Sequence, residues 1–346
     1  MATAQLAEGR ALAASRSLLE TLTEGYGPRD FAVRFWDGST WEPDPGQPAR
    51  FTLALNHPGA VRAMFWPFNN AGLGEAYIYD DFDIEGDAIA FVGLLRYVVN
   101  RKWTIGQKAN ILWRLSRLPK EEKPRVGRGA ARLSGGYRSP ERDRQAISYH
   151  YDQPGEFFQL FLDPHAQYSC AYFKTPDDDL ETAQRQKLDL ICRKLRLKPG
   201  ERLLDIGSGW GGLVMHAAKH YGVNAFGITL SRRQFEWAER RIREEGLQDR
   251  CRVECRDYRD LSESEPFDKA VSVGVAEHFG ERMMPVFFDK LWKVMRPGGV
   301  YLHHCITLKN FMPYPRWTAF ARKYVFPDGE VRPLLTSLRA GEQAGF

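Results

Sequence analysis

The sequence has few cysteines and no long apolar run. Its five cysteines, among 346 residues, form no CxxC pair, and an odd number at such spacing argues against a disulfide framework and against a metal site built on cysteine. No stretch approaches the roughly 18 consecutive apolar residues that a membrane-spanning helix needs. Residues 1–27 are rich in Ala and Leu but carry charges throughout, which predicts an amphipathic helix and not a signal peptide. We therefore expect a cytoplasmic protein without a metal centre.

The sequence also lacks a large excess of charge and a recognised nucleic-acid-binding motif. The net charge is +5, which is small for this length, and no reader motif accompanies the basic residues, so nucleic acid is not an expected partner. Hydrophobic residues make up 43% of the chain, which excludes global disorder. The length predicts two domains.

The first hundred residues predict a small α+β domain. Residues 34–43 have the pattern of a strand followed by a turn, residues 50–58 alternate in polarity like a strand, and residues 89–100 have the apolar face of a helix. No catalytic constellation is visible between residues 1 and 100, so we expect the chemistry to lie in the rest of the chain.

Residues 101–146 form a basic segment. Lys and Arg are frequent between residues 101 and 144, where only four acids occur. The first half mixes these bases with apolar residues such as Trp103 and Trp113, and the second half, rich in Gly, Pro and Arg, predicts a mobile linker. A basic amphipathic helix can attach to anionic lipid headgroups, although an ordinary solvated helix explains the composition equally well.

Strand and helix patterns alternate from residue 147 onward. Short apolar runs of β type are separated by amphipathic helical segments. This alternation predicts a mostly parallel sheet covered by helices on both faces. We therefore predict that residues 147–346 form an α/β domain.

A glycine-rich turn, Gly207–Gly212, follows the first predicted strand of this domain, which ends at Leu203–Ile206. Glycines at such a turn let the backbone approach a ligand closely. Nicotinamide and flavin enzymes share this device, but the next strand, which ends at Gly227–Ser231, lacks the acid that holds their ribose. Asp257 and Tyr258 follow the third strand, where methyltransferases commonly hold adenine. These features favour S-adenosylmethionine as the cofactor, and the alternative is a turn that only packs helix on strand.

A series of ordered motifs runs through the second half of the sequence: HYD (150–152), FLDPHAQYSCAYF (161–173), LKPGERLLDIGSGWGG (197–212), GITLSRRQ (227–234), RDYRDL (256–261), SVGVAEHFG (272–280), LHHCIT (302–307) and KYVFPDG (323–329). Together they resemble the cyclopropane fatty acid synthase family, which includes the mycolic acid cyclopropane synthases. The resemblance extends from Ile147 to Gly329, and residues 72–87 resemble the longer bacterial members. It implies a Rossmann-like class I methyltransferase domain with a mostly parallel seven-stranded sheet, preceded by a lipid-binding-like domain in residues 1–100.

The resemblance also implies which residues contact the cofactor. Tyr168 and Ser169 would line its methionine end with the glycine turn, and Gln234 would help to hold the ribose. Asp257 and Tyr258 would hold the adenine. The full set that we expect to bind the cofactor is Tyr168, Ser169, Asp205, Gly207, Gly209, Thr229, Leu230, Gln234, Asp257 and Tyr258.

In the family, a bicarbonate ion lies beside the transferred methyl group. The positions that match its binding residues, and that we expect to be catalytic, are Cys170, Glu277, His304, Ile306 and Tyr324, with Cys170 and Ile306 contributing backbone groups. A small bound anion can stabilise a carbocation and accept its proton. Considered without the motif, Glu277 would more often be a surface acid that caps a helix, and His304 a core histidine. We expect their neighbours His278 and His303 to be structural.

The sequence departs from the family pattern at three places. Ser208 stands where members commonly have Cys, and Ala276 stands where Phe is commoner. Family members also continue beyond the point where this sequence ends, with helices that help to cover the acyl site. We therefore expect that these helices are missing here or that a partner supplies the cover.

The function that the resemblance implies is cyclopropanation of unsaturated acyl chains in phospholipids, at the anionic inner face of a membrane. Three alternatives remain: the same chemistry ending in a methylene or methyl branch, N-methylation of a small amine, and a protein that binds lipid or cofactor without turnover. The double-bond position, the headgroup and the oligomeric state, a homo-oligomer included, are left open by the sequence.

Overall fold

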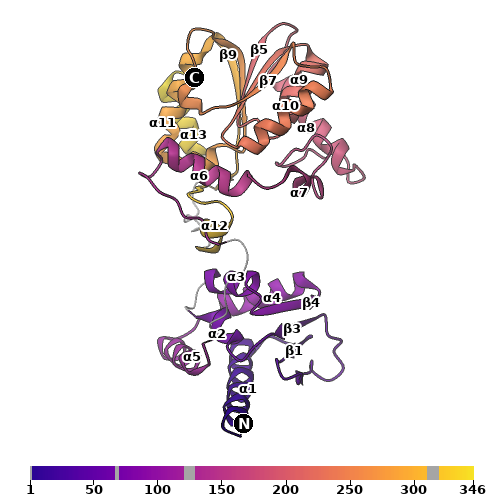
Figure 1. The fold of residues 1–346 in the computed structure, drawn as a ribbon, viewed down its shortest axis with the longest axis vertical. Coiled ribbons are helices and arrows are strands. Elements are labelled where there is room, and N and C mark those ends of the chain that lie inside the picture. Colours follow the sequence, from indigo (N-terminus) through magenta and orange to yellow (C-terminus); the bar gives the residue numbers. More distant parts are fainter. Residues whose placement is uncertain (1, 67–69, 121–128, 310–318) are drawn as a thin grey trace. The chain divides into compact units, whose positions relative to one another are not determined.

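The structure, a computed structural model, describes residues 2–66, 70–120, 129–309 and 319–346 (Figure 1). The chain divides into two compact units, the first formed by residues 1–130 with 318–321 and the second by residues 131–317 with 322–346. Within the described ranges, no helix combines the length and the apolar character that crossing a membrane requires.

The first unit is built around a four-stranded sheet in the order β2-β1-β3-β4. β1 and β3 run parallel, and the two outer pairs are antiparallel. Phe31 and Phe51 stack in its core with ring centroids 5.3 Å apart. The elements are α1 (Ala2–Thr23), β1 (Phe31–Arg34), β2 (Thr40–Trp41), β3 (Phe51–Leu55), α2 (Ala60–Phe65), α3 (Asn70–Ile78), β4 (Phe82–Gly86), α4 (Ala88–Asn100) and α5 (Ile105–Arg117).

The first half of the basic segment belongs to this first unit. Thr104 and Gln107 form a capping box at the start of α5, and Ile111 and Leu115 are buried in the core of the unit. Arg114 donates hydrogen bonds to two hydroxyl groups of α1. The first unit therefore extends past residue 100, because one face of α5 is apolar and packs on the core.

The second unit contains a five-stranded sheet in the order β7-β6-β5-β8-β9, in which every neighbouring pair is parallel. One core lies between the sheet and the helices α8, α9 and α10, and a second core lies between the sheet and α11 and α13 (Figure 1). The elements are α6 (Pro140–Tyr151), α7 (Gly155–Gln159), α8 (Leu180–Lys194), β5 (Arg202–Ile206), α9 (Gly212–Tyr221), β6 (Asn224–Thr229), α10 (Arg232–Glu244), β7 (Cys251–Cys255), η1 (Tyr258–Asp260), β8 (Phe267–Val273), α11 (Ala276–Val294), β9 (Met295–His304), β10 (Thr307–Leu308), α12 (Ala319–Tyr324), β11 (Arg332–Pro333) and α13 (Leu334–Ala344).

The sheet of the second unit has five strands in the described part of the chain, where the family resemblance implied seven. After β9, the described residues form a separate two-stranded parallel sheet of β10 and β11, together with α12 and α13. The expected covered α/β architecture is otherwise present, since helices pack on both faces of the sheet.

The strand order places a binding site at one edge of this sheet. The chain runs from β5 outward to β6 and β7, and then crosses to the other side of β5 to form β8 and β9. In open parallel sheets, ligands bind beyond the carboxyl ends of the strands at the point where the order reverses. That point lies here between the ends of β5 and β8.

Candidate active site

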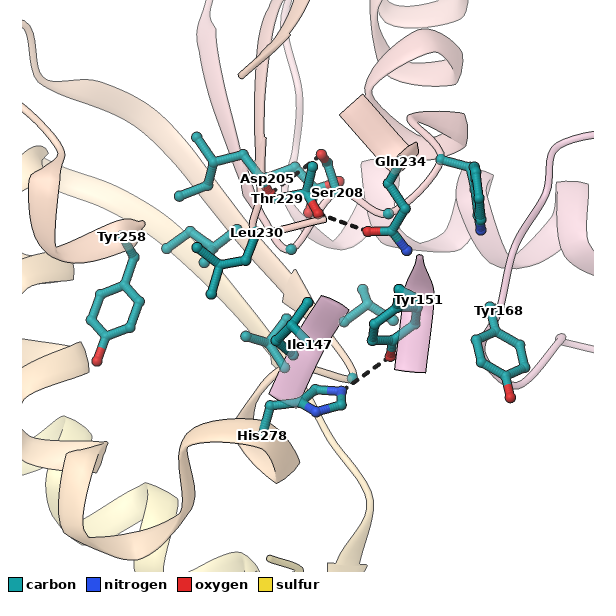
Figure 2. Close-up of a pocket in the computed structure, with 18 of the residues that line it drawn as sticks. Ile147, Tyr151, Tyr168, Asp205, Ser208, Thr229, Leu230, Gln234, Tyr258 and His278 are labelled. Atoms are coloured by element: carbon teal, nitrogen blue, oxygen red, sulfur yellow. Dashed lines mark hydrogen bonds between the residues drawn. The ribbon is translucent and has the colours of Figure 1, made fainter. Parts of the chain in front are cut away.

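A cavity lies at this switch point, beyond the carboxyl ends of β5, β6 and β8 (Figure 2). Its walls come from the turn after β5, the end of β6, the start of α10, η1, α6 and the segment that precedes α8. Nine of the ten residues expected to bind the cofactor line it: Tyr168, Ser169, Asp205, Gly207, Gly209, Thr229, Leu230, Gln234 and Tyr258.

The glycine turn after β5 contains three glycines of left-handed conformation. Gly207 has φ +77°, Gly209 has φ +54° and Gly211 has φ +84°, a region that side chains disfavour. A Cβ atom on Gly207 would lie 2.4 Å from Val275 Cγ2. The N–H groups of Gly207 and Ser208 both donate to the carbonyl of Ile228, each at 2.9 Å, so the turn is fixed to the end of β6.

The end of β6 and the start of α10 are joined by side-chain hydrogen bonds. The Thr229 hydroxyl donates to Gln234 Oε1 at 2.7 Å, and the backbone N–H of Gln234 donates to Ser231 Oγ at 3.2 Å, which caps α10. The Ser231 hydroxyl in turn donates to Asp152 Oδ1 at 2.6 Å. Thr229 and Gln234 are therefore held as one polar group at the cavity wall.

Asp257 does not line the cavity, unlike its neighbour Tyr258. Its buried carboxylate accepts hydrogen bonds from the backbone N–H of Arg259 at 2.9 Å and from Arg259 Nη2 at 2.6 Å. The same guanidinium group forms an ion pair with Asp143 at 2.9 Å. Asp257 thus orients the residues beside the cavity, and its contact with adenine stays a prediction.

A second cavity adjoins the first and gathers four of the five expected catalytic residues: Cys170, Glu277, His304 and Ile306. Tyr324 ends α12 and is half-buried, but it is not among the described residues that line this cavity. The two cavities share the wall residues Tyr151, Tyr168, Ser169, Gly274 and His278. The expected methyl donor and the expected anion site therefore lie next to each other.

Glu277 is the buried acid of this second cavity. Its side chain comes from the first turn of α11 and is only 8% exposed. The backbone N–H of Ile306 donates to Glu277 Oε1 at 2.5 Å, whereas Oε2 is buried without a partner among the described residues. Burial raises the pKa of Glu277, and the hydrogen bond from Ile306 opposes that rise. Its burial rules out the alternative of a surface acid.

The three histidines near Glu277 differ in their surroundings. Burial lowers the pKa of His304, which lines the cavity, and the charge of Lys187 lowers it further. His303 is half-buried and contacts Tyr301 at 2.8 Å, as expected of a structural residue. His278 has the expected structural contact, at 3.1 Å to the Tyr151 hydroxyl, but it also lines both cavities.

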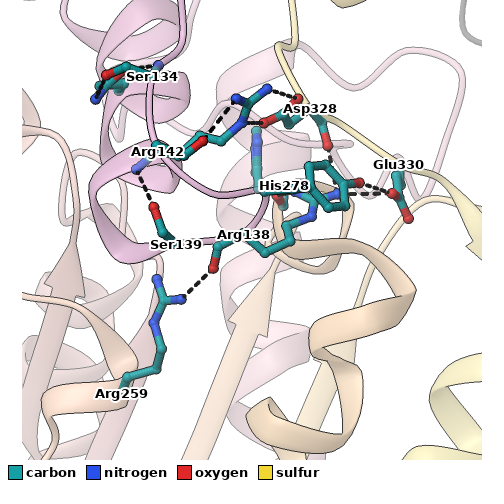
Figure 3. Close-up of polar contacts among 11 residues, drawn as sticks. Ser134, Arg138, Ser139, Arg142, Arg259, His278, Asp328 and Glu330 are labelled. Atoms are coloured by element: carbon teal, nitrogen blue, oxygen red, sulfur yellow. Dashed lines mark hydrogen bonds and ion pairs between the residues drawn. The ribbon is translucent and has the colours of Figure 1, made fainter.

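A buried ion-pair network fixes the start of α11 (Figure 3). Arg138, whose side chain is 2% exposed, donates to the His278 carbonyl at 2.5 Å and to the Asp328 carbonyl at 2.7 Å, and it pairs with Glu330 at 3.1 Å. Arg142 pairs with Asp328 at 2.5 Å. Arg138 and Arg142 lie in the stretch expected to be a linker, and both have long-range partners in the structure; its mobility stays a prediction.

Some wall residues were missed by the sequence analysis or placed only within a motif. Tyr151 belongs to the HYD motif, but no role was assigned to it. Trp210, in the glycine-rich turn, was given no role; it is 3% exposed and lines the cofactor cavity, and its ring centroid lies 5.1 Å from that of Phe158. Trp210 therefore forms part of the cavity wall and also packs against Phe158.

The glycine turn, the switch point and the polar groups of β6 and α10 form the site of a Rossmann-like methyltransferase. Its glycine-rich turn, which lets the backbone approach a ligand, and its mixed apolar and polar walls fit S-adenosylmethionine. Residues 138–346 match the family model described as Mycolic acid cyclopropane synthetase. The chain belongs to this family, and it is an S-adenosylmethionine-dependent methyltransferase.

Relatives and a solved structure agree with this assignment. A "Probable fatty acid methyltransferase" of Pseudomonas putida is 36% identical over 89% of this chain and 72% of its own length. The cyclopropane-fatty-acyl-phospholipid synthase of Escherichia coli is 43% identical over 52% of this chain and 45% of its own length. The crystal structure of a mycolic acid cyclopropane synthase complexed with SAH and CTAB has a TM-score of 0.54 and 33% identity, and the match covers 59% of this chain and 74% of that one.

Proposed function

We propose that the protein transfers the methyl carbon of S-adenosylmethionine to the double bond of an unsaturated acyl chain in a phospholipid, and that the product is a cyclopropane ring. The observation that carries the proposal is the buried Glu277 carboxyl group. One of its oxygens has no hydrogen-bond partner among the described residues, and it lies in a cavity that shares a wall with the cofactor cavity. The synthase relative from Escherichia coli supports the same lipid class.

S-adenosylmethionine, when bound, supplies an electrophilic methyl group. Because an alkene is a weak nucleophile, the protein must hold the double bond in line with that methyl group. The shared wall of Tyr151, Tyr168 and Ser169 is the surface against which both reactants would be aligned. Closing the ring also releases a proton, which a group in the second cavity must accept.

The second cavity fits a small oxyanion such as bicarbonate, which would supply the base. A carboxyl group that keeps its proton can donate a hydrogen bond to an anion, and burial raises the pKa of Glu277 in that direction. The buried Oε2 atom, free of partners among the described residues, is available for this contact. The Ile306 N–H, expected to point at the anion, donates instead to Oε1 and thereby orients the carboxyl group.

The test is mass spectrometry of vesicles of a monounsaturated phospholipid after incubation with the protein and S-adenosylmethionine labelled at its methyl carbon. The expected result is one labelled CH₂ added per modified chain, and no product with Glu277→Gln. Unmodified lipid, from protein shown separately to bind S-adenosylhomocysteine, would overturn the proposal.

A methyl or methylene branch is the second candidate product. The Pseudomonas putida relative, which matches 89% of this chain, is named a fatty acid methyltransferase and not a cyclopropane synthase. The two outcomes share the methyl transfer and differ in which proton is lost and in any later reduction. NMR of the product lipid separates them, because ring protons resonate upfield of any methyl branch.

We further propose that the protein binds anionic membrane surfaces through α5 and the residues just before it. Lys102, Lys108 and Arg117 are exposed, as are the apolar side chains of Ile105 and Trp113. Bases beside exposed apolar groups favour an anionic lipid surface.

Vesicle co-sedimentation tests the membrane proposal. Replacing Lys102, Lys108 and Arg117 by Gln should weaken binding to anionic vesicles, and added salt should weaken wild-type binding, because surface electrostatics are screened. The matched control replaces three exposed bases of the second unit, Lys194, Lys198 and Arg233. Equal binding by the two triple variants would remove α5 as the contact.

A further inference from the structure

Lys187 is a buried lysine that the proposed reaction does not use. It lies on α8, outside all the motifs that resemble the family, and is only 8% exposed. Its ammonium group donates hydrogen bonds to Gln167 Oε1 at 2.9 Å and to Ser169 Oγ at 2.8 Å. Burying an ammonium group is costly unless it is paired and hydrogen-bonded. These two hydrogen bonds reduce that cost, and the reason for placing a buried charge here needs a physical explanation.

Both acceptors belong to a segment that lines the cofactor cavity. Gln184 lies one turn before Lys187 on the same face of α8, and its Nε2 donates to the backbone carbonyls of Ser169 at 2.9 Å and Gln167 at 3.3 Å. Asp163 accepts from the backbone N–H of Gln167 at 2.9 Å. Lys187 and Gln184 thus hold the side chains and the backbone of residues 167–169 at the cavity wall.

Several ionisable groups near Lys187 interact with its charge. Burial lowers the pKa of Lys187 to about 8, while Asp163, Asp205 and Cys170 favour its charged form. Asp205 is 2% exposed at the end of β5, under the glycine turn, and burial raises its pKa to about 7 against the opposing charge of Lys187. The same charge disfavours protonation of His304 in the second cavity.

We propose that Lys187 is a positioning residue for the methionine end of S-adenosylmethionine: its charge balances Asp205 beneath the glycine turn, and its two hydrogen bonds fix Gln167 and Ser169 at the cavity wall. The positions of the residues that would bind the cofactor therefore depend on the ammonium group of Lys187, although Lys187 is not among the described residues that line the cavity. This inference deepens the proposed function but rests only on the cofactor, not on the lipid substrate.

The experiment measures the affinity for S-adenosylhomocysteine by calorimetry over a range of pH, with the full chain. Lys187→Met should weaken binding by about tenfold near neutral pH, because a buried hydrogen-bonded charge is lost. Lys194→Met, an exposed lysine on the same helix, should bind like the wild type. Wild-type affinity should fall as the pH rises through about 8, where Lys187 loses its charge, and Lys187→Met should lack this fall. The ligand's own titration is common to all the proteins and cancels in their comparison.

The pH profile separates positioning from a merely structural role. Affinity of Lys187→Met within twofold of wild type at every pH would overturn the proposal, and so would a loss that is the same at every pH. Adding Asp205→Asn to Lys187→Met removes both buried charges, so the double variant should unfold at a higher temperature than Lys187→Met, which keeps the test available if the single variant is unstable. An unfolding temperature no higher than that of Lys187→Met would refute the charge balance. The assay measures only the affinity for S-adenosylhomocysteine. The role of Lys187 can therefore be supported even if the protein modifies no lipid and the proposed function fails.

Discussion

The Glu277 carboxyl group is buried at a cost in stability. Its pKa is raised by burial above the usual 4.5. A carboxyl group with a raised pKa keeps its proton to higher pH in the folded than in the unfolded state. The unfolded state therefore binds fewer protons above pH 4.5, and the free energy of unfolding falls as the pH rises through that region.

Glu277→Gln should accordingly be more stable than the wild type at alkaline pH and inactive. The gain in unfolding temperature should shrink toward pH 4.5, while turnover should fall by about 100-fold or more. Thermal unfolding across pH and the labelled-lipid assay measure the two effects. Glu281→Gln, at an exposed position of the same helix, is the control. Unchanged unfolding temperatures would contradict a cost of burial, and wild-type turnover would exclude Glu277 from the reaction.

At the scale of elements, α11 depends on a glycine near its start. Gly280 has φ 65° and ψ −176° inside the helix. A Cβ atom there would lie 2.4 Å from Glu330 Oε2 and 2.6 Å from Arg138 Nη2. A side chain at this position would therefore displace the Glu330 carboxylate and the Arg138 guanidinium group from their ion pair.

Gly280→Ala should lower the free energy of unfolding by about 1–3 kcal/mol and should reduce turnover, because Glu277 and His278 lie in the adjoining turn. Gly298→Ala is the matched control: Gly298 also has a positive φ, +76°, but a Cβ atom there would meet nothing within 4 Å. Denaturant unfolding and the labelled-lipid assay compare them. Equal losses in the two variants would assign the effect to backbone strain and not to the network.

Elements with a strong local pattern could be predicted from the sequence. The helix expected at residues 89–100 is α4 (Ala88–Asn100), and the turn after β5 has the expected glycines. The burial of Arg138 could not be predicted, because its partner Glu330 lies far along the chain and leaves no local periodicity. Lys187 on an amphipathic helix has the sequence pattern of a surface lysine, and only the packing of the Gln167 segment against α8 buries it.

At the scale of the whole molecule, the two units have separate hydrophobic cores, and the described residues that line the two cavities all belong to the second unit. A ligand that binds one folded unit stabilises that unit by mass action, about 2.7 kcal/mol at a free concentration 100 times Kd. Calorimetry should therefore show two unfolding transitions, of which S-adenosylhomocysteine raises only one. A parallel shift of both would mean that the units unfold cooperatively.

Five residues belong to the walls of both cavities. Any movement of this common wall changes the shape of both compartments, so occupancy of one is thermodynamically linked to occupancy of the other. Reciprocity then requires that S-adenosylmethionine changes the affinity for the proposed lipid substrate by the same factor by which that lipid changes the affinity for S-adenosylmethionine. The five shared wall residues are thus the positions at which substitutions should alter this coupling.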